Sequence, residues 1–149
     1  PVRLHPLCKE IHDAHIFRCP KGVELIYEPS DENIVIDGDK NRIFQVISNL
    51  IGNAFKFTTA GHISYGYHQE GKYVAFHVTD TGMGIAPDKV DRVFERFVKL
   101  NTFAKGTGLG LAICRVIVER LGGTIGADSK EGEGSCFWFR LPITPKSNN

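Results

Sequence analysis

The sequence predicts an α+β fold, a two-layer α/β sandwich in which helices pack on a sheet. Two observations predict this class. Segments with helical apolar periodicity alternate along the chain with segments rich in β-branched and aromatic residues. Several of the β segments follow one another through tight turns, so the sheet is expected to be rich in antiparallel pairs. The chain has 149 residues and is 42% apolar, enough for one domain with its own core.

The first third of the chain predicts two helices and two short strands. Apolar residues recur on one face from Leu4 to Arg18, which indicates a helix. The segments VELIYEP and NIVID indicate strands separated by a Pro-Ser-Asp turn. A second helix is expected from about Asp39, which suits an N-cap, to about Phe57.

The middle of the chain predicts a hairpin and a short helix. HISYGYHQEGKYVAFHVTD contains two β-rich runs joined across residues 69–72. Pro87 then opens a short helix that runs through Phe97, because proline suits the first position of a helix. A loop over residues 98–105 follows.

The last third predicts one helix and two strands. The helix runs from about Leu109 to Leu121 and ends at two glycines, which are common just beyond a helix C-terminus. TIGADS and SCFWFRLPI follow as strands. Residues 1–143 are expected to form the domain and residues 144–149 a tail or linker, as in a domain cut from a longer protein.

Composition argues against several classes of function. The formal net charge is +1 and the cations are dispersed, so neither nucleic acid nor an anionic membrane surface is expected as a partner. No apolar run approaches the roughly 20 residues of a membrane span. The four cysteines form no C-x-x-C pair and lie in apolar surroundings, which favours buried free thiols in a reducing compartment.

The expected second helix carries a polar stripe beside its apolar face. Arg42, Gln45, Asn49, Asn53 and Lys56 fall in this stripe on a helical wheel of about 100° per residue. A solvated helix face would also explain it, but Asn prefers caps and turns to helix interiors. Amide oxygens can bind Mg²⁺, and an ammonium can contact phosphates. The stripe is therefore a candidate site.

A strand that ends in Asp80 is followed by Gly82 and Gly84. One interpretation is an Asx turn, in which Asp80 caps its own backbone and the glycines supply positive φ angles. The other is a binding site, in which Asp80 accepts a hydrogen bond from an exocyclic amine. The glycines would then let a flat ring lie against the backbone. This segment alone does not decide between the two.

The stretch KGTGLGLAIC places three glycines directly before a predicted helix. It lacks the Gly-Lys-Ser/Thr ending of a Walker loop. It also lacks the G-x-G-x-x-G spacing and the preceding strand of a dinucleotide-binding fold. A helix N-terminus after glycines can still face an anion, so the stretch is either a hinge or an unusual phosphate-binding turn.

Taken together, these motifs resemble those of the catalytic ATP-binding domain of sensor histidine kinases. NLIGNAFKFT is similar to the N box of that family, DTGMGI to its G1 box, FERF to its F box and GTGLGLAI to its G2 box. GEGSCFWFRLP resembles the closing G3 region. The superfamily also includes gyrase, heat-shock chaperones and mismatch-repair ATPases. The resemblance implies the Bergerat fold, a mixed sheet of about five strands packed on three helices.

The resemblance implies roles for the N box residues. Asn53 would bind Mg²⁺ through its amide oxygen, Asn49 would line the site near the terminal phosphate of ATP, and Lys56 would offset phosphate charge. The ATPase branches carry Glu where this chain has Asn49. Because an amide cannot accept a proton from water, Asn49 favours phosphoryl transfer to another nucleophile over hydrolysis.

The resemblance also implies an adenine site and a mobile lid. Asp80 would accept a hydrogen bond from the adenine amino group, and Gly82 and Gly84 would shape the ring pocket. The other nucleotide-binding residues would lie in the lid and at its end: Phe94, Arg96, Phe97, Lys99, Gly106, Thr107, Gly108, Leu109 and Gly110. Core packing for the phenylalanines and surface positions for Arg96 and Lys99 are alternatives.

The phospho-acceptor motif of the family, His followed by Glu or Asp with a nearby Pro, is missing. His12-Asp13 comes nearest but lacks the proline, and His15, His62, His68 and His77 are expected to be surface or strand residues. The acceptor histidine is therefore expected on a separate dimerisation domain, with a response regulator downstream. We expect this fragment to be a monomeric cytoplasmic domain of an inner-membrane sensor protein.

Three alternative functions remain open from the sequence. A serine/threonine kinase of the anti-sigma or mitochondrial type shares these motifs. An ATPase switch of the chaperone or topoisomerase type is disfavoured by Asn49. A non-catalytic interaction module is disfavoured by the intact Asn53, Asp80 and glycines.

Overall fold

In the computed structural model, the described residues are 1–31, 33–84 and 110–143. The strands are β1 (Val2–Arg3), β2 (Val23–Glu28), β3 (Val35–Ile36), β4 (Gly61–Glu70), β5 (Tyr73–Asp80), β6 (Thr124–Lys130) and β7 (Gly134–Pro142). The helices are α1 (Leu4–His15), α2 (Lys40–Phe57) and α4 (Gly110–Arg120), with a 3₁₀ turn, η1 (Ile16–Arg18), after α1.

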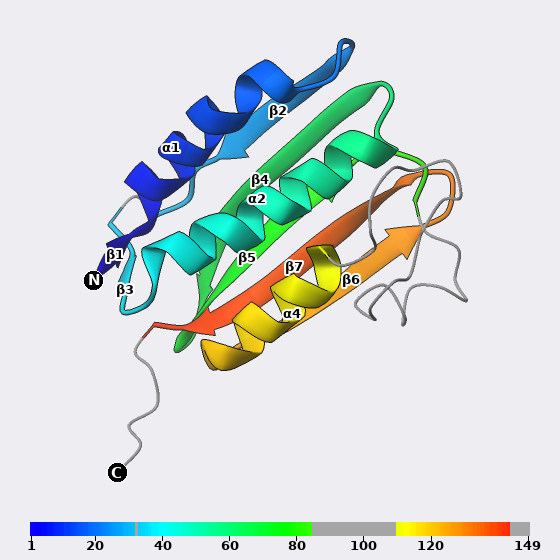
Figure 1. Cartoon of the computed structure of the whole chain (residues 1–149). Coiled ribbons are helices and arrows are strands. Elements are labelled where there is room, and N and C mark those ends of the chain that lie inside the picture. The colour runs from blue at the N-terminus through cyan, green and yellow to red at the C-terminus, as the bar shows by residue number, and fades with distance from the viewer. Residues whose placement is uncertain (32, 85–109, 144–149) are drawn as a thin grey trace.

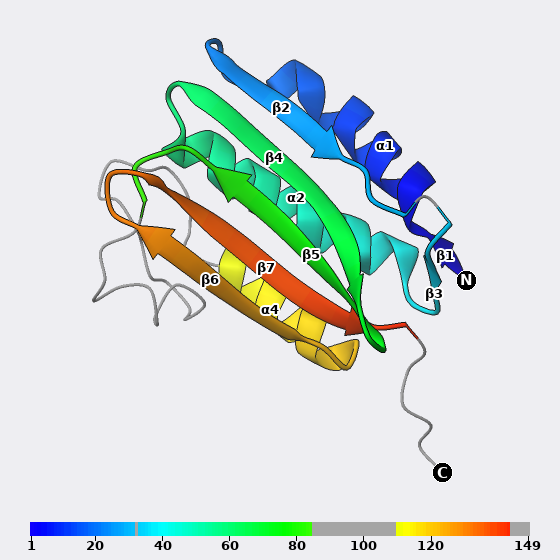
Figure 2. The ribbon, with the colours of Figure 1, turned by 180° about the vertical axis from the view of Figure 1, so that it is seen from behind.

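The main sheet is mixed and has five strands in the order β2-β4-β5-β7-β6. β2 pairs in parallel with β4, and the other neighbours are antiparallel. A parallel pair needs a crossover connection, and α2 supplies it between β2 and β4. Helices α1, α2 and α4 lie on one face of this sheet (Figure 1), and the opposite face is seen from behind in Figure 2. The expected two-layer α/β sandwich is confirmed.

Helix α2 forms where its capping residue and apolar periodicity predict it. Asp39 is the N-cap, and its Oδ1 accepts hydrogen bonds from the backbone N–H groups of Asn41 at 3.0 Å and Arg42 at 3.2 Å. The helix ends where Thr58 adopts an extended backbone. The residues buried along its apolar face are Ile43, Val46, Ile47, Leu50, Ile51 and Ala54.

Helix α4 ends in a glycine motif, as the sequence predicts. Gly122 has φ +85°, and its N–H bonds the carbonyl of Glu119 at 3.0 Å. The N–H of Gly123 bonds the carbonyl of Val118 at 2.9 Å, which completes a Schellman motif. The motif satisfies two carbonyl groups of the last turn and directs the chain into β6.

Two sequence predictions about the N-terminal region need correction. The first helix ends at His15, and the expected helical residues 16–18 form η1 instead. His15 is not a surface or strand residue: it is 3% exposed, and its Nδ1–H donates to the carbonyl of Ile11 at 2.7 Å. A carbonyl four residues back in the helix supplies the partner that makes the buried ring tolerable.

NIVID contributes less strand than predicted, and its partner was missed. Only Val35 and Ile36 form a strand, and they pair with Arg3 and Val2 in a separate two-stranded sheet. The four cysteines are free as expected, but Cys19 and Cys136 are only partly buried. Burial raises the pKa of the Cys8 thiol to about 12, so that thiol stays protonated at neutral pH.

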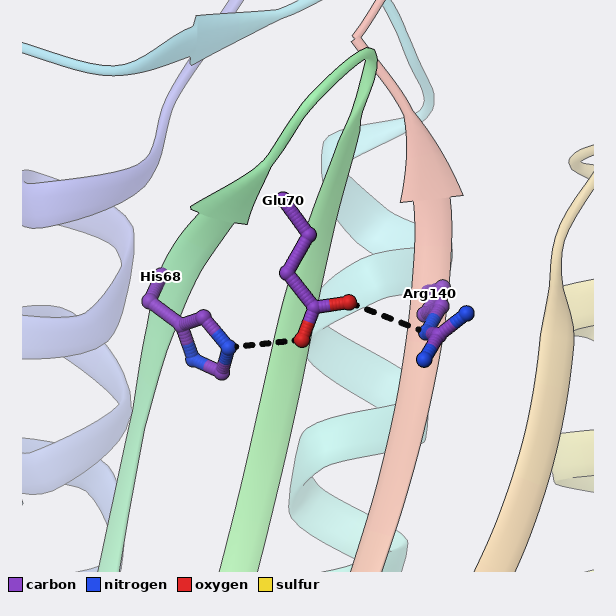
Figure 3. Close-up of polar contacts among 3 residues, drawn as sticks. All are labelled: His68, Glu70 and Arg140. Atoms are coloured by element: carbon purple, nitrogen blue, oxygen red, sulfur yellow. Dashed lines mark hydrogen bonds and ion pairs between the residues drawn. The ribbon is translucent and has the colours of Figure 1, made fainter.

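The sheet face away from the helices is stabilised by polar groups that span neighbouring strands. Glu70 accepts a hydrogen bond from the His68 ring at 2.8 Å and forms an ion pair with Arg140 at 3.3 Å (Figure 3). In the strand register His68 and Arg140 flank Ala75, which is buried on this face. The Arg140 guanidinium also lies 5.6 Å from the ring centre of Trp138.

Candidate functional site

Helix α2 carries the polar stripe beside its buried face, as predicted. Asn49 and Asn53 are half-buried and Lys56 is exposed. Residues four apart on a helix lie one above the other, about 6 Å apart along the axis. No hydrogen bond or ion pair within the described residues engages the side chains of Asn53 or Lys56. Both groups can therefore bind something else.

Asp80 is the last residue of β5 and is only 6% exposed. Its carboxylate accepts the N–H of Gly82 at 2.9 Å. Burial raises the pKa of the Asp80 carboxyl, and the backbone N–H groups of Gly82 and Ser135 oppose that rise in part. The hydrogen bond of the Asx turn is present and Gly84 has a positive φ, but Gly82 does not, so that interpretation is confirmed only in part. The turn uses little of the hydrogen-bonding capacity of a carboxylate.

The residues after Asp80 are fixed between α2 and the β6–β7 turn. The N–H of Met83 bonds the carbonyl of Phe57 at 3.2 Å, and the N–H of Gly132 bonds the carbonyl of Met83 at 2.7 Å. A Cβ on Gly82 would lie 2.3 Å from the Phe57 carbonyl oxygen. The structure thus brings the end of the α2 stripe and Asp80 to the same end of the molecule (Figure 1).

Gly82 and Gly84 have a role that the ring-pocket hypothesis did not include. Gly84 has φ +70°, and a Cβ there would lie 2.2 Å from the carbonyl oxygen of Lys130. Both glycines are therefore required by packing of backbone on backbone. Their presence does not by itself require a bound ring.

Sequence reasoning missed three residues around Asp80. A Cβ on Gly134, which has φ +136°, would lie 2.1 Å from the Asp80 carbonyl oxygen. Ser135 lies opposite Asp80 in the β5–β7 pairing, and its backbone N–H lowers the pKa of the Asp80 carboxyl. Thr58 is 2% exposed, and its Oγ1 has no hydrogen-bond partner in the described part of the chain. Only the Gly-x-Gly spacing of GEGSCFWF signalled any of these contacts in advance.

The donors available to a metal ion are amide oxygens and not a cluster of ionisable side chains. Among residues 1–31, 33–84 and 110–143, no group of three or more His, Cys, Asp or Glu could hold a metal ion. Mg²⁺ commonly takes only one or two protein oxygens and completes its shell with water and substrate phosphates. The Asn53 amide fits that kind of site.

Helices α2 and α4 meet beside Asn49. Cys114 of α4 is fully buried, and its Sγ lies 3.8 Å from the carbonyl oxygen of Val46 in α2. Burial raises the pKa of the Cys114 thiol to about 11, and the Asn49 side chain opposes part of that rise. The helix that follows the glycine stretch thus packs directly on α2.

An apolar groove lies on the outer side of the same helix pair. Its volume is about 560 Å³, and Ile113 and Val116 beside it are 41% and 49% exposed. Arg42 and Arg120 are among the residues that line it. The residues that line it are Asp39, Arg42, Ala112, Ile113, Val116, Ile117, Arg120 and Leu121.

Most of the predicted lid lies outside the described residues. This applies to the expected Pro87 helix and to Phe94, Arg96, Phe97, Lys99, Gly106, Thr107, Gly108 and Leu109. Gly110 is described: it is the exposed first residue of α4, and a Cβ there would meet nothing within 4 Å. Among the described helices, none is long and apolar enough to cross a membrane.

Comparison with known proteins identifies the family. Residues 38–145 match the family described as histidine kinase-, DNA gyrase B-, and HSP90-like ATPases. The chain belongs to this family. It is 40% identical over 132 residues to the sensor histidine kinase RcsC of Escherichia coli strain K12. It is 38% identical over 128 residues to the sensor histidine kinase RppB of a Synechocystis strain.

Solved structures of this ATPase family agree with the fold. The catalytic domain of the histidine kinase ThkA superposes with a TM-score of 0.86 and 31% identity, covering 97% of this chain and 95% of that domain. Full-length ShkA in complex with AMPPNP superposes with a TM-score of 0.89 and 35% identity, covering 99% of this chain and 31% of ShkA. The described fold is that of a histidine kinase catalytic domain.

The longer relatives extend well beyond this domain. The matched region covers 86% of this chain but 14% of RcsC, and 81% of this chain but 28% of RppB.

Proposed function

We propose that this chain binds Mg²⁺ and ATP and donates the γ-phosphoryl group to a histidine on a dimerisation domain outside the chain. The observation that carries the proposal is the meeting of two polar elements at one end of the fold. The α2 stripe ends in Asn53 and Lys56, whose side chains have no hydrogen bond or ion pair to another described residue. The buried Asp80 carboxylate is close by, because Met83, three residues after it, bonds the Phe57 carbonyl at the end of α2.

Each of these residues binds a different part of the nucleotide or its metal ion. Asp80 accepts a hydrogen bond from the adenine amino group, because its buried carboxylate has acceptor capacity left. Lys56 offsets phosphate charge as an exposed point-like cation. Asn53 offers an amide oxygen to Mg²⁺, which when bound neutralises charge on the transferring phosphoryl group.

In this proposal Asn49 favours phosphoryl transfer over ATP hydrolysis. Its amide cannot remove a proton from water, so the domain itself lacks a general base at that position. The nucleophile is then an imidazole brought in by another domain. This reading favours a histidine kinase over the ATPase switch, and it predicts slow ATP turnover by the isolated chain.

Asn53→Ala is expected to abolish the Mg²⁺-dependent part of ATP binding. The variant removes the proposed metal ligand and leaves the Asp80 region intact. Titration of a fluorescent ATP analogue with and without Mg²⁺ should show that Mg²⁺ tightens binding by the wild type and not by the variant. We expect ATP affinity measured with Mg²⁺ to fall at least as far as the roughly 10- to 100-fold that loss of an outer-shell partner costs a metal site.

The matched control is Asn41→Ala, which removes the same side chain from the exposed first turn of α2. It should bind like the wild type. Absence of saturable ATP binding by the wild type would contradict the proposed function. Rapid ATP turnover by the wild type would favour the ATPase alternative, and unchanged phosphoryl transfer by Asn53→Ala would favour a non-catalytic module.

We propose that the groove beside α4 receives the helices of the acceptor-histidine domain. Ile113 and Val116 are apolar and exposed, which is unusual for two residues on one turn of a surface helix. The lining cations Arg42 and Arg120 suit an acidic partner surface, and the family acceptor histidine is followed by an acidic residue. The longer relatives leave room for such a domain outside the matched region.

Val116→Glu is expected to abolish or strongly slow phosphoryl transfer and to leave ATP affinity unchanged. The new carboxylate places charge in the apolar contact, remote from Asp80 and Asn53. Transfer is measured with labelled ATP in the longer kinase, and affinity by titration of this chain. Val35→Glu is the matched control, since Val35 is 40% exposed on β3. Equal effects of the two variants would refute the docking face.

We also propose that residues 1–143 form the catalytic domain and residues 144–149 a tail or linker. The domain is monomeric by itself, works in the cytoplasm, and belongs to an inner-membrane sensor protein that signals through a response regulator. It contacts neither nucleic acid nor the membrane.

A further inference from the structure

Among the described residues, Phe17 is the most exposed large apolar side chain. It lies in the 3₁₀ turn η1 after α1 and is 94% exposed, whereas Val116, the next in order, is 49% exposed. Ile16 beside it is 37% exposed. Leaving a phenylalanine in water forgoes the hydrophobic free energy that its burial against a partner would recover.

The loop that carries Phe17, residues 16–22, is braced by hydrogen bonds at both of its ends. The N–H of Cys19 bonds the carbonyl of Ile16 at 3.3 Å, and the Cys19 thiol donates to the carbonyl of Val23 at 3.1 Å. The N–H of Val23 bonds the carbonyl of Pro20 at 3.1 Å. A side chain presented on a braced loop loses less conformational entropy when an interface buries it. Phe17 is therefore suited to anchor a partner.

Two cations accompany Phe17 on this loop. Arg18 and Lys21 are both exposed, and neither forms an ion pair with another described residue. Aromatic residues and arginine are enriched at protein interfaces. The loop thus presents an apolar anchor between two positive charges, and it fits a pocket that is apolar and carries acidic residues.

The chain has such a pocket between α1 and β2, which is an edge strand of the main sheet. Its volume is about 340 Å³. A cavity of about 150 Å³ can hold a benzene ring, so the pocket can hold a phenyl side chain. Apolar atoms of Leu25, Ile26 and Tyr27 line it, together with the exposed carboxylates of Asp13 and Glu24.

The remaining polar groups of the pocket leave it acidic and closed to a strand. Lys9 supplies one positive charge against the two carboxylates. The His12 Nε2–H donates to the carbonyl of Leu25 at 3.0 Å. Because this carbonyl on the outer edge of β2 already has a partner, an added strand could not use it. The pocket therefore suits an inserted side chain.

We propose that the chain pairs with a second copy of itself by exchange of Phe17. Phe17 of each copy enters the α1–β2 pocket of the other, and Arg18 and Lys21 face the carboxylates of the partner's Asp13 and the partner's Glu24. Asp13 lies four residues before Phe17, and Glu24 lies three residues after Lys21. Anchor and pocket are thus parts of one surface, as a two-fold self-complementary contact requires.

The pair is weak, because each copy contributes one aromatic anchor and small interfaces are transient. The free chain is then monomeric at micromolar concentration. The inference rests on the proposed function in one step: the dimerisation domain would tether two copies at an effective concentration of roughly 1 mM and so favour the pair. Figure 1 shows α1 and α4 on opposite sides of α2, so pairing leaves the groove beside α4 accessible.

The test uses two charge-reversed variants of this chain, in which every substituted residue is exposed. One carries Arg18→Glu with Lys21→Glu, and the other carries Asp13→Lys with Glu24→Lys. Either variant alone brings like charges together, whereas a 1:1 mixture restores both contacts with their signs exchanged. In sedimentation equilibrium near the tethered concentration, about 1 mM, the wild type and the mixture should associate and each variant alone should stay monomeric.

Phe17→Ser should weaken self-association at least about 30-fold, the loss expected when an interface anchor is removed. The residue is exposed, so the substitution leaves the core of the folded domain intact. Tyr73→Ser is the matched control, because Tyr73 is 37% exposed on β5 and lies outside the pocket, and it should associate like the wild type. Concentration-dependent ¹⁵N NMR shifts should map to residues 9–13 and 24–27.

Three outcomes would overturn the inference. A wild-type chain that stays monomeric at this concentration would exclude the pair. Equal losses in Phe17→Ser and Tyr73→Ser would indicate non-specific association. Unchanged self-association in Phe17→Ser, with weaker binding to vesicles of phosphatidylserine and phosphatidylcholine, would make the loop a membrane contact instead. None of these results bears on ATP binding by the chain, and its absence would refute the proposed function separately.

Discussion

Asp80→Asn is expected to abolish tight nucleotide binding and, at the same time, to stabilise the folded domain without nucleotide. The carboxylate is buried, and its charge costs free energy that two backbone N–H groups only partly recover. Asparagine has nearly the same shape and carries no charge. Hydrogen bonds to charged groups contribute about 1.5–3 kcal/mol, so ATP affinity should fall about 10- to 100-fold.

The pH dependence of unfolding gives an independent check. The raised pKa of Asp80 means that the folded state binds this proton more tightly than the unfolded chain does. The wild-type free energy of unfolding therefore contains a term that falls as pH rises above the unfolded Asp value of about 3.9 and levels off beyond the raised folded pKa. Urea unfolding of Asp80→Asn across this range should lack that fall.

Asp128→Asn is the matched control for this pair of effects. Asp128 lies on β6 opposite Cys136, which itself lies opposite Thr79, so Asp128 is two strands across the sheet from the residue before Asp80. Its substitution should leave ATP affinity unchanged. The prediction is contradicted if Asp80→Asn destabilises the domain and loses ATP affinity only to the extent that it unfolds. The carboxylate would then have a structural role and would not contact the base.

Gly82→Ala is expected to separate the Asp80 segment from α2 and so to lose nucleotide binding. The added Cβ would lie 2.3 Å from the Phe57 carbonyl oxygen and 2.9 Å from the Thr58 Oγ1, and the backbone atom cannot rotate away. Overpacking of this kind costs about 1–3 kcal/mol. Calorimetric melting and ATP titration should both report the loss.

Gly52→Ala is the control on the same helix. A Cβ there meets nothing within 4 Å, and the position is inside α2. We expect it to raise the free energy of unfolding by about 0.5–1 kcal/mol and to leave ATP affinity unchanged. Equal destabilisation by both substitutions would contradict the close contact at Gly82.

Local sequence pattern predicted the elements of this fold better than it predicted their neighbours. The Asp39 cap, the buried face of α2 and the glycine end of α4 each depend on residues a few positions apart, and all three were confirmed. The β1–β3 pair was missed because strands of two residues carry no measurable alternation. His15 was misjudged because its burial depends on Phe44, whose ring centre is 6.1 Å away on α2.

In the candidate site, too, local features were predicted and contacts between distant segments were not. The stripe on α2 and the position of Asp80 followed from helical spacing and from the end of a strand. The contacts of Gly82 with Phe57, and of Cys114 with Val46, join segments 25 or more residues apart in the chain. No periodicity encodes such contacts, so only the folded structure displays them.

The described domain begins and ends at one pole. Val2 pairs with Ile36, and the N–H of Asp37 bonds the carbonyl of Ile143 at 3.0 Å, so residues 2 and 143 lie at the same end of the sheet (Figure 1). Asp80 lies at the far end of β5, seven residues or about 23 Å from Tyr73, which pairs with Pro142.

Any tether attached to either terminus would therefore hold the domain by that pole and leave the Asp80 pole to swing. A small rotation of the domain about the attachment point therefore moves the Asp80 end through a larger distance than it moves the residues near the termini. In a longer protein, the encounter rate between the Asp80 pole and a tethered partner would be set by the length and stiffness of that linker, through its effective concentration.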